Sequence, residues 1–560
     1  MPRSSLAAGT PRFPDWTAYD VARLGGRDFL GLQSAGDILL DALLPGMTNA
    51  TRHPRYYAFF CWLFQRAHAL GLSAKATEDL TFRYETALVY AAQATHAGDF
   101  PGIVGIRSVD RGDMVWQGPE RRYSLTKQQW AKRVSAFSAP VYGPSFTRLG
   151  LLERHSSGTI ALHPAGQRLA ETFARGIGAT AELERISTRK TAEGHTFVDL
   201  HDDLCPCAVR GGAKPERPLL VDLLFRLQDR RSGPVADLDR ARRTSLAFLL
   251  DLVAAADGDF PKMEDDLRTL LYFWRFPSGA RYTPPPALRQ TATGWRLFQT
   301  RQYQRYAIEA VWVAYLQLIA RNGALPFNTS IVVRELGDRI DADGLLTGAR
   351  TATRRLRTST LADIESRAQK RIGNNSWATV APNDTWAEAK WKERIDEALD
   401  DDPASTIGSA LGLLAMLWLR WREHDDMSVR PFLGAGGRAR ISVASMLTDF
   451  DSRKTMSLPA LLAWLLEEYA IGQHMRIATN KLRTEGLDTF WFIAREDGYI
   501  MHEGREVGDV RPGYNAPKLW AALSALYDLR LLGRNRDGAY VATAEGKRIL
   551  EQVIDAEAHA

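Results

Sequence analysis

The chain has 560 residues, of which 45% are hydrophobic and 25% charged, an ordinary balance for a globular protein of several domains. Its formal net charge of +6 permits nucleic-acid binding without requiring it. Three cysteines exclude a disulfide framework, and the N-terminus has no apolar signal core, so we expect a cytoplasmic protein. The longest apolar run, 407–419, is shorter than the ~18–20 residues that span a bilayer, so no membrane partner is expected.

Helical periodicity dominates from residue 33 onward. An early predicted helix, 54–71, carries aromatic residues at helical spacing, which indicates a face that packs into a core. Arg52 and Arg55 stand at its N-terminus, where the helix dipole disfavours cations. An internal carboxylate, such as Asp37 or Asp41, is the favoured counter-charge, and a bound phosphate is the alternative.

The stretch Gly31 to Trp62 reads GLQSAGDILLDALLPGMTNATRHPRYYAFFCW. It resembles the N-terminal segment of uncharacterised bacterial proteins found among mobile-element and phage-defence genes. The resemblance covers these residues alone. It implies a component of a multi-protein system and brings no assigned activity with it.

A repeat links two distant parts of the chain. Residues 149–168 and 529–548 align without a gap, and seven of the twenty positions are identical. Each copy predicts a helix, a short strand, a turn containing Gly158 or Gly538, a return strand and a second helix. The C-terminal copy resembles the wing of bacterial winged-helix proteins of the multiple-antibiotic-resistance regulator type, and the first copy departs from it at His163 and Pro164.

Winged helices contact DNA through one helix and a basic wing, although others dock on proteins, and both alternatives stay open here. The basic residues of the two copies are Lys518, Arg534, Arg536, Arg148 and Arg154. A second basic stretch lies at 348–372, where positions spaced i, i+4, i+7 share one helix face. Its arginines predict either a phosphate-binding stripe or a solvated helix face. They are Arg350, Arg354, Arg355, Arg357 and Arg371.

One segment has the residue types of a metal site. His195, His201, Cys205 and Cys207 offer imidazole nitrogen and thiolate, the donors that zinc prefers in a tetrahedral site. The C-x-C spacing is not that of a standard zinc knuckle, and a plain loop with two thiols is the alternative.

These features predict a mainly α protein in which two winged-helix-like (α+β) units flank a long helical middle. The predicted segments are an N-terminal helical domain (1–125), a first winged-helix-like unit (126–178), a helical segment with the metal loop (179–290), a helical middle domain (291–430) and a C-terminal winged-helix-like domain (431–560). The layout is similar to that of kleisin-type subunits, which bridge chromosome-organising ATPases.

No phosphate-binding loop of the P-loop type and no zinc-protease or serine-hydrolase motif is present in the sequence. We therefore expect a non-enzymatic DNA-associated adaptor subunit, in phage or plasmid defence, that bridges DNA to an ATPase or nuclease partner. One alternative is a metal-dependent enzyme acting on nucleic acid, centred on 195–207. Another is a winged-helix transcriptional regulator, and a homodimer is open in each case.

Overall fold

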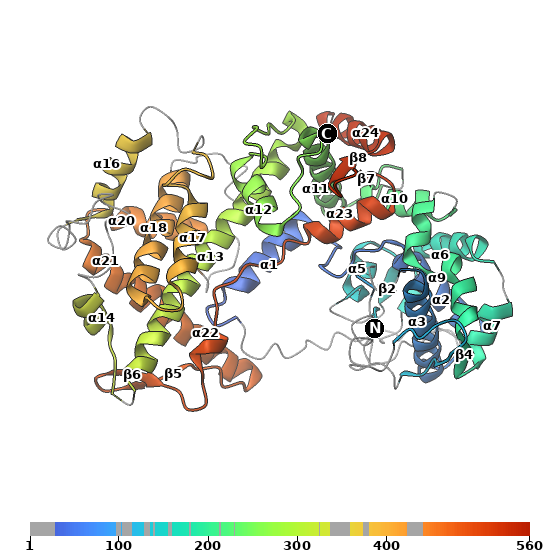
Figure 1. Cartoon of the computed structure of the whole chain (residues 1–560), viewed down its shortest axis with the longest axis horizontal. Coiled ribbons are helices and arrows are strands. Elements are labelled where there is room, and N and C mark those ends of the chain that lie inside the picture. The colour runs from blue at the N-terminus through green and yellow to red at the C-terminus, as the bar shows by residue number, and fades with distance from the viewer. Residues whose placement is uncertain are drawn as a thin grey trace, which may run out of the picture. The chain divides into compact units, whose positions relative to one another are not determined.

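The structure is a computed structural model. It describes residues 28–96, 102–103, 115–127, 135–137, 141–154, 160–178, 181–211, 214–228, 230–323, 325–336, 359–372, 380–422 and 441–559. These residues are mainly helical, with a few short strands, which confirms the mainly α fold class (Figure 1). None of the helices they form is both long enough and apolar enough to cross a lipid bilayer.

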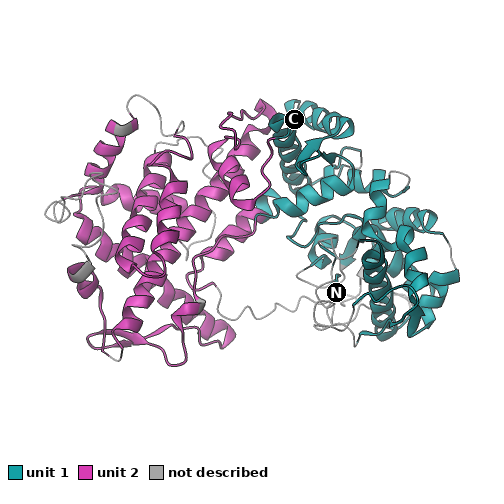
Figure 2. Cartoon of the chain, in the orientation of Figure 1, with its two compact units in different colours: residues 1–23, 41–258, 517–560 teal, residues 24–40, 259–516 magenta. Residues whose placement is uncertain are grey.

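The chain forms two compact units, and neither is one continuous segment (Figure 2). Unit 1 is built from 41–258 and 517–560. Unit 2 is built from the described residues before 41 and from 259–516. Helix α1 (Leu32–Leu43) carries the chain from unit 2 into unit 1. Unit 1 therefore contains both copies of the sequence repeat, although 380 positions separate them in the chain.

Unit 1 is a set of helices with three two-stranded antiparallel ribbons, β1–β4, β2–β3 and β7–β8. Its elements are α2 (Arg55–Ala69), α3 (Ala74–His96), β1 (Arg122–Ser124), α5 (Gly143–Arg148), β2 (Leu152–Arg154), β3 (Ile160–Leu162), α6 (Pro164–Gly176), α7 (Ala181–Thr188), β4 (Thr191–Glu193), α8 (Gly194–Asp199), α9 (His201–Leu204), η3 (Pro206–Gly211), α10 (Arg217–Phe225), α11 (Pro234–Ala256), α23 (Leu519–Asp528), β7 (Leu532–Arg534), β8 (Tyr540–Ala542) and α24 (Ala544–Ala558). Helix α2 packs on α6, α3 packs on α8 and α9, and α11 packs on α24. The aromatic residues of α2 are buried, as their spacing predicts.

Unit 2 is organised around one long buried helix, α13 (Arg289–Arg321), which packs against α18. The remaining elements are α12 (Glu264–Phe273), η4 (Pro286–Leu288), α14 (Thr329–Leu336), α16 (Leu361–Ile372), α17 (Glu388–Ala398), α18 (Pro403–Trp421), α20 (Val443–Ser452), α21 (Leu458–Trp464), the π-helix η6 (Leu465–Gly472), α22 (Gln473–Glu485), β5 (Phe492–Arg495), β6 (Gly498–Met501) and η7 (Val507–Asp509). A buried ion pair joins α17 to α18, because Arg420 donates to both carboxylate oxygens of Glu388. The hydroxyl of Tyr272 donates to the same carboxylate at 2.7 Å.

In their described residues, the two repeat copies have the same two strands and the same start of the second helix, in the same register. In the ungapped alignment of the copies, β7 has the bounds of β2, β8 has the bounds of β3, and α24 begins at the position where α6 begins. The hydrogen bonds repeat as well. The Leu151 N–H donates to the Phe146 carbonyl at 2.9 Å, and the Leu531 N–H donates to the Leu526 carbonyl at 2.9 Å. Helix, hairpin and helix thus form one unit that occurs twice.

A close backbone approach explains the glycine that both copies share. A Cβ added at Gly166 would overlap the carbonyl oxygen of Leu151, and one added at Gly546 would overlap that of Leu531. The hydroxyl of Thr543 caps α24 by accepting the Gly546 N–H at 3.0 Å, as the sequence indicates. His163 holds the matching position in the first copy, and its side chain makes no such cap.

We expect Gly546→Ala to lower the free energy of unfolding by about 1–3 kcal/mol, since the added methyl group has no space beside a carbonyl oxygen. Helix propensity alone predicts the opposite sign, a gain of about 1 kcal/mol. The matched control is Gly533→Ala in the same hairpin, where the new Cβ would lie 3.5 Å from Val541 Cγ2, an ordinary contact. Chemical denaturation measures both, and an unchanged or raised stability for Gly546→Ala contradicts the packing argument.

Candidate metal centre

The segment from His201 to Cys207 folds as two short helical turns that gather three candidate ligands. Helix α9 ends at Leu204, and the N–H of the following Cys205 donates to the His201 carbonyl oxygen at 2.8 Å. Pro206 then begins η3, and across this junction Cys205 Sγ lies 3.0 Å from Cys207 Sγ. His201 Nε2 lies 3.3 Å from Cys207 Sγ. The local backbone alone therefore brings together one imidazole and two thiols.

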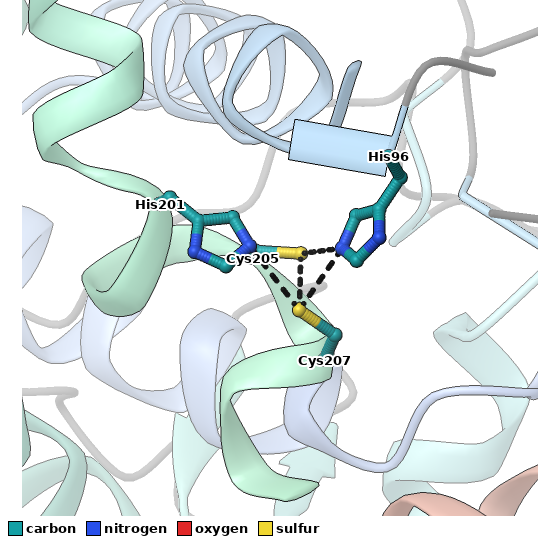
Figure 3. A group of neighbouring side chains, drawn as sticks. All are labelled: His96, His201, Cys205 and Cys207. Atoms are coloured by element: carbon teal, nitrogen blue, oxygen red, sulfur yellow. Dashed lines mark hydrogen bonds between the residues drawn. The ribbon is translucent and has the colours of Figure 1, made fainter. Parts of the chain in front are cut away.

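The fourth candidate ligand comes from another helix. His96 is the last residue of α3, which packs against α9, and its Nε2 lies 3.1 Å from Cys207 Sγ and 3.5 Å from Cys205 Sγ (Figure 3). His195, which the sequence suggested for this position, lies instead beside Glu120 at 3.0 Å, with its side chain exposed. His96 therefore replaces His195 in the ligand set.

The four ligand atoms have the spacing of a tetrahedral site. All of them lie within 4.8 Å of one another. A zinc ion with bonds of about 2.0 Å to nitrogen and 2.3 Å to sulfur holds neighbouring ligand atoms about 3.3–3.8 Å apart. The four distances given above run from 3.0 to 3.5 Å, so side-chain shifts of up to about 1 Å, mainly a separation of the two sulfurs, place an ion at the centre. Two thiols and two imidazoles suit zinc better than magnesium or calcium, which prefer oxygen.

The protonation of the cluster suits a cation as well. The hydrogen bond from Cys205, with the imidazoles of His201 and His96, lowers the pKa of the Cys207 thiol to about 4. The same pairing and burial raise the pKa of the Cys205 thiol. Zinc requires both sulfurs as thiolates, and its charge would favour the loss of the second proton.

Neighbouring groups orient two of the ligands. The Nδ1 atom of His201 lies 3.0 Å from a carboxylate oxygen of Asp202, which leaves Nε2 to face the sulfurs. The buried guanidinium of Arg55 donates from Nη1 to the Cys205 carbonyl at 2.6 Å and from Nε to Glu216 at 2.9 Å. The first residue of α2 is therefore bonded directly to a ligand residue of the candidate metal centre.

The carboxylate beside Arg55 is Glu216 and neither of the residues expected from the sequence. Asp37 accepts the side-chain amide of Asn515 at 2.7 Å, and Asp41 accepts Lys518 at 2.5 Å. The counter-charge is internal, as the favoured alternative held, but its identity differs because residues 55 and 216 meet only through the fold. Arg52, the other predicted anion-binding residue, is partly buried.

The predicted DNA-contacting residues of the repeat fall into two groups. Lys518 and Arg148 both pair with Asp41, at 2.5 and 2.9 Å, so their charges are engaged within unit 1. Arg534 and Arg536 are exposed on the β7–β8 hairpin, and Arg534 lies over the rings of Tyr527 and Tyr540.

Of the others, Arg154 lies in β2 and Arg371 in α16. Arg350, Arg354, Arg355 and Arg357 lie outside the described residues.

Comparison with protein-family models, with curated proteins and with solved structures gave no match to this chain. The site is therefore interpreted from its own residues. Sequence reasoning missed His96 because it stands 111 positions before Cys207, at the end of a helix whose other residues gave no metal signal. The one available signal was its position, since a polar residue at a helix end beside a breaker-rich stretch is well placed to reach another segment.

We expect the purified protein to hold one zinc per chain. His96→Ala should lower zinc affinity by more than about 100-fold, because changes even to the groups behind metal ligands lower affinity by about 10–100-fold. His195→Ala is the matched control and should bind zinc as the unaltered chain does. Elemental analysis and competition with a chromogenic chelator measure both. Loss of zinc from His195→Ala with retention by His96→Ala would reverse the assignment.

We expect Arg55→Ala to lower the free energy of unfolding by about 3–5 kcal/mol, because Glu216 is left buried and unpaired. Arg55→Met with Glu216→Leu should recover most of the loss, since no buried charge remains. The control on the same helix is Arg66→Ala, whose pair with the exposed Glu184 should contribute less than about 1 kcal/mol. Unfolding of these variants in denaturant measures the changes in the free energy of unfolding. An Arg55→Ala loss no larger than that of Arg66→Ala contradicts the argument.

Proposed function

We propose that this chain is a non-enzymatic, zinc-stabilised adaptor that associates with DNA. The observation that carries the proposal is the set of four protein ligands, two imidazoles and two thiols, converging on one point. A zinc ion with four protein ligands is typical of structural sites, whereas catalytic zinc keeps one position open for water or substrate. The ion would fasten the end of α3 to the α9–η3 segment and so stabilise unit 1.

The same observation disfavours the alternative of a metal-dependent enzyme on nucleic acid. Such an enzyme needs an open coordination position to activate water. Among the described residues, the cluster of His96, His201, Cys205 and Cys207 is the one group of His, Cys, Asp and Glu whose spacing fits a metal ion. The enzyme proposal therefore has no second site in that part of the chain.

The C-terminal helix–hairpin–helix unit supports DNA contact through its hairpin rather than through a helix. Each of the ten residues of α23 is buried or partly buried, so this helix has no free face to place in a groove. Arg534 and Arg536 are exposed on the hairpin and suit phosphate oxygens. Phosphate contact without base contact gives binding that depends little on sequence. This favours an adaptor over the alternative of a sequence-specific transcriptional regulator.

The partner side of the proposal follows from the same mode of binding. An adaptor that binds DNA without recognising its sequence must obtain specificity from another subunit. We propose that this partner is an ATPase or a nuclease. The resemblance of residues 31–62 to proteins of phage-defence gene clusters supports such an assembly in bacteria. A homodimer remains a further proposal that sedimentation would test.

We expect duplex DNA to bind with an affinity that falls steeply as salt rises, since each phosphate contact releases counterions. Arg534→Glu with Arg536→Glu should weaken binding and reduce the salt slope by about 2, roughly one per lost phosphate contact. Fluorescence anisotropy of labelled duplexes of two unrelated sequences measures the affinity and the slope.

The control for this experiment is Arg189→Glu with Lys190→Glu, which makes the same change in net charge at exposed positions of unit 1. It should alter binding far less than the hairpin variant. Equal losses in the two variants would reduce the effect to overall charge. No binding near physiological salt would make both helix–hairpin–helix units protein-docking modules.

A further inference from the structure

The two sulfurs of the candidate metal centre lie unusually close together for free thiols. Cys205 Sγ and Cys207 Sγ are 3.0 Å apart, on residues separated by Pro206 alone. A disulfide bond requires a separation of about 2.05 Å, so the sulfurs need to approach by about 1 Å. Rotations of the two side chains would bring the sulfurs toward each other.

The accessibility of the cysteines differs in a way that selects one of them. Cys207 is less deeply buried than Cys205 and Cys61. Cys207 is also the sulfur to which both imidazoles are close, since His96 Nε2 and His201 Nε2 lie 3.1 and 3.3 Å from it. A small oxidant from solvent therefore meets Cys207 first, with Cys205 directly behind it as the resolving thiol.

We propose that Cys205 and Cys207 are a modification site, a dithiol that hydrogen peroxide or a similar small hydroperoxide oxidises to a disulfide with release of the metal ion. This proposal rests on the zinc centre proposed above and adds a redox reaction of its two cysteine ligands. Cys207 sulfur attacks one peroxide oxygen, the O–O bond breaks, and Cys207 becomes a sulfenic acid while hydroxide leaves. Cys205 sulfur then attacks the Cys207 sulfur and displaces the hydroxyl group as water.

The reaction balances in atoms and electrons with hydrogen peroxide as the oxidant. Two thiolates, one hydrogen peroxide and two protons give one disulfide and two waters, so the cysteines lose two electrons and the peroxide gains them. The disulfide has no thiolate left to bind zinc. Two imidazoles alone do not complete a tetrahedral site, so the ion leaves. Reduction of the disulfide by a dithiol restores both ligands, which makes the modification reversible.

Loss of the ion has a structural effect within unit 1. His96 ends α3, and the metal centre fastens that end to the α9–η3 segment. The Cys205 carbonyl continues to accept Arg55, so the segment stays attached to α2, and its packing on α3 loses only the bond through the metal ion. Peroxide would therefore loosen one contact between helices and leave the rest of unit 1 folded.

The test uses the full-length zinc-loaded protein and stepwise additions of hydrogen peroxide. Released zinc is measured with a chromogenic chelator, and the peptide that contains Cys205 and Cys207 is weighed by mass spectrometry. We expect zinc release to rise in step with a loss of about two mass units, the two thiol hydrogens. A dithiol reductant with added zinc should reverse both changes. The Cys61 peptide is the internal control and should keep its mass.

Two variants sharpen the assignment. In Cys205→Ser, Cys207 has no resolving thiol and should accumulate as a sulfenic acid, which a dimedone adduct detects. Cys61→Ala should behave as the unaltered chain. The proposal is overturned if the 205–207 peptide keeps its mass in excess peroxide, or if Cys207 gains oxygen while Cys205 stays a thiol. If elemental analysis finds no zinc, the proposed zinc centre is wrong. The mass of the 205–207 peptide then shows by itself whether peroxide converts the dithiol to a disulfide.

Discussion

The organisation of unit 1 depends on how one buried charge is neutralised. Arg55 stands at the start of α2 with its side chain enclosed, and a guanidinium in that position is tolerated only when carboxylate and carbonyl groups surround it. Glu216 supplies the charge, and the Cys205 carbonyl supplies a further acceptor. The ring of Phe173 on α6 lies 5.1 Å away and covers one face. Three segments distant in sequence are thereby fixed around one cation.

The duplicated helix–hairpin–helix unit follows a second constraint of the same kind, a backbone contact that admits no side chain. Gly166 and Gly546 let each second helix approach the backbone of the leucine that precedes the first strand of its hairpin. The two copies differ at many other positions while this contact is kept. The first copy carries His163 where the second has the capping residue Thr543. The backbone contact thus constrains the unit more tightly than the cap or the charges on its hairpins.

The sequence predicted those features that depend on interactions between residues close together in the chain. The helical class, the core face of α2, the repeat and the cap at Thr543 could all be derived from spacing, because each depends on residues a few positions apart. His201, Cys205 and Cys207 could be grouped for the same reason. His96 and Glu216 could not, because they stand 111 and 161 positions from the residues they meet. The ion pairs of Lys518 and Arg148 with Asp41 could not be predicted for the same reason. A count of charges in a sequence does not show which charges are paired in the fold.

The division of the chain into units has a consequence for its synthesis. Unit 1 needs residues 517–560, and Asp528 from that segment is buried between His53 and Arg210. While the ribosome is still producing the intervening segment, 259–516, these two partners lack their carboxylate and α11 lacks the helix that packs on it. The part of unit 1 that is made first, 41–258, therefore stays incompletely folded until 517–560 has been synthesised. A chaperone that shields apolar helix faces during translation would act during this interval.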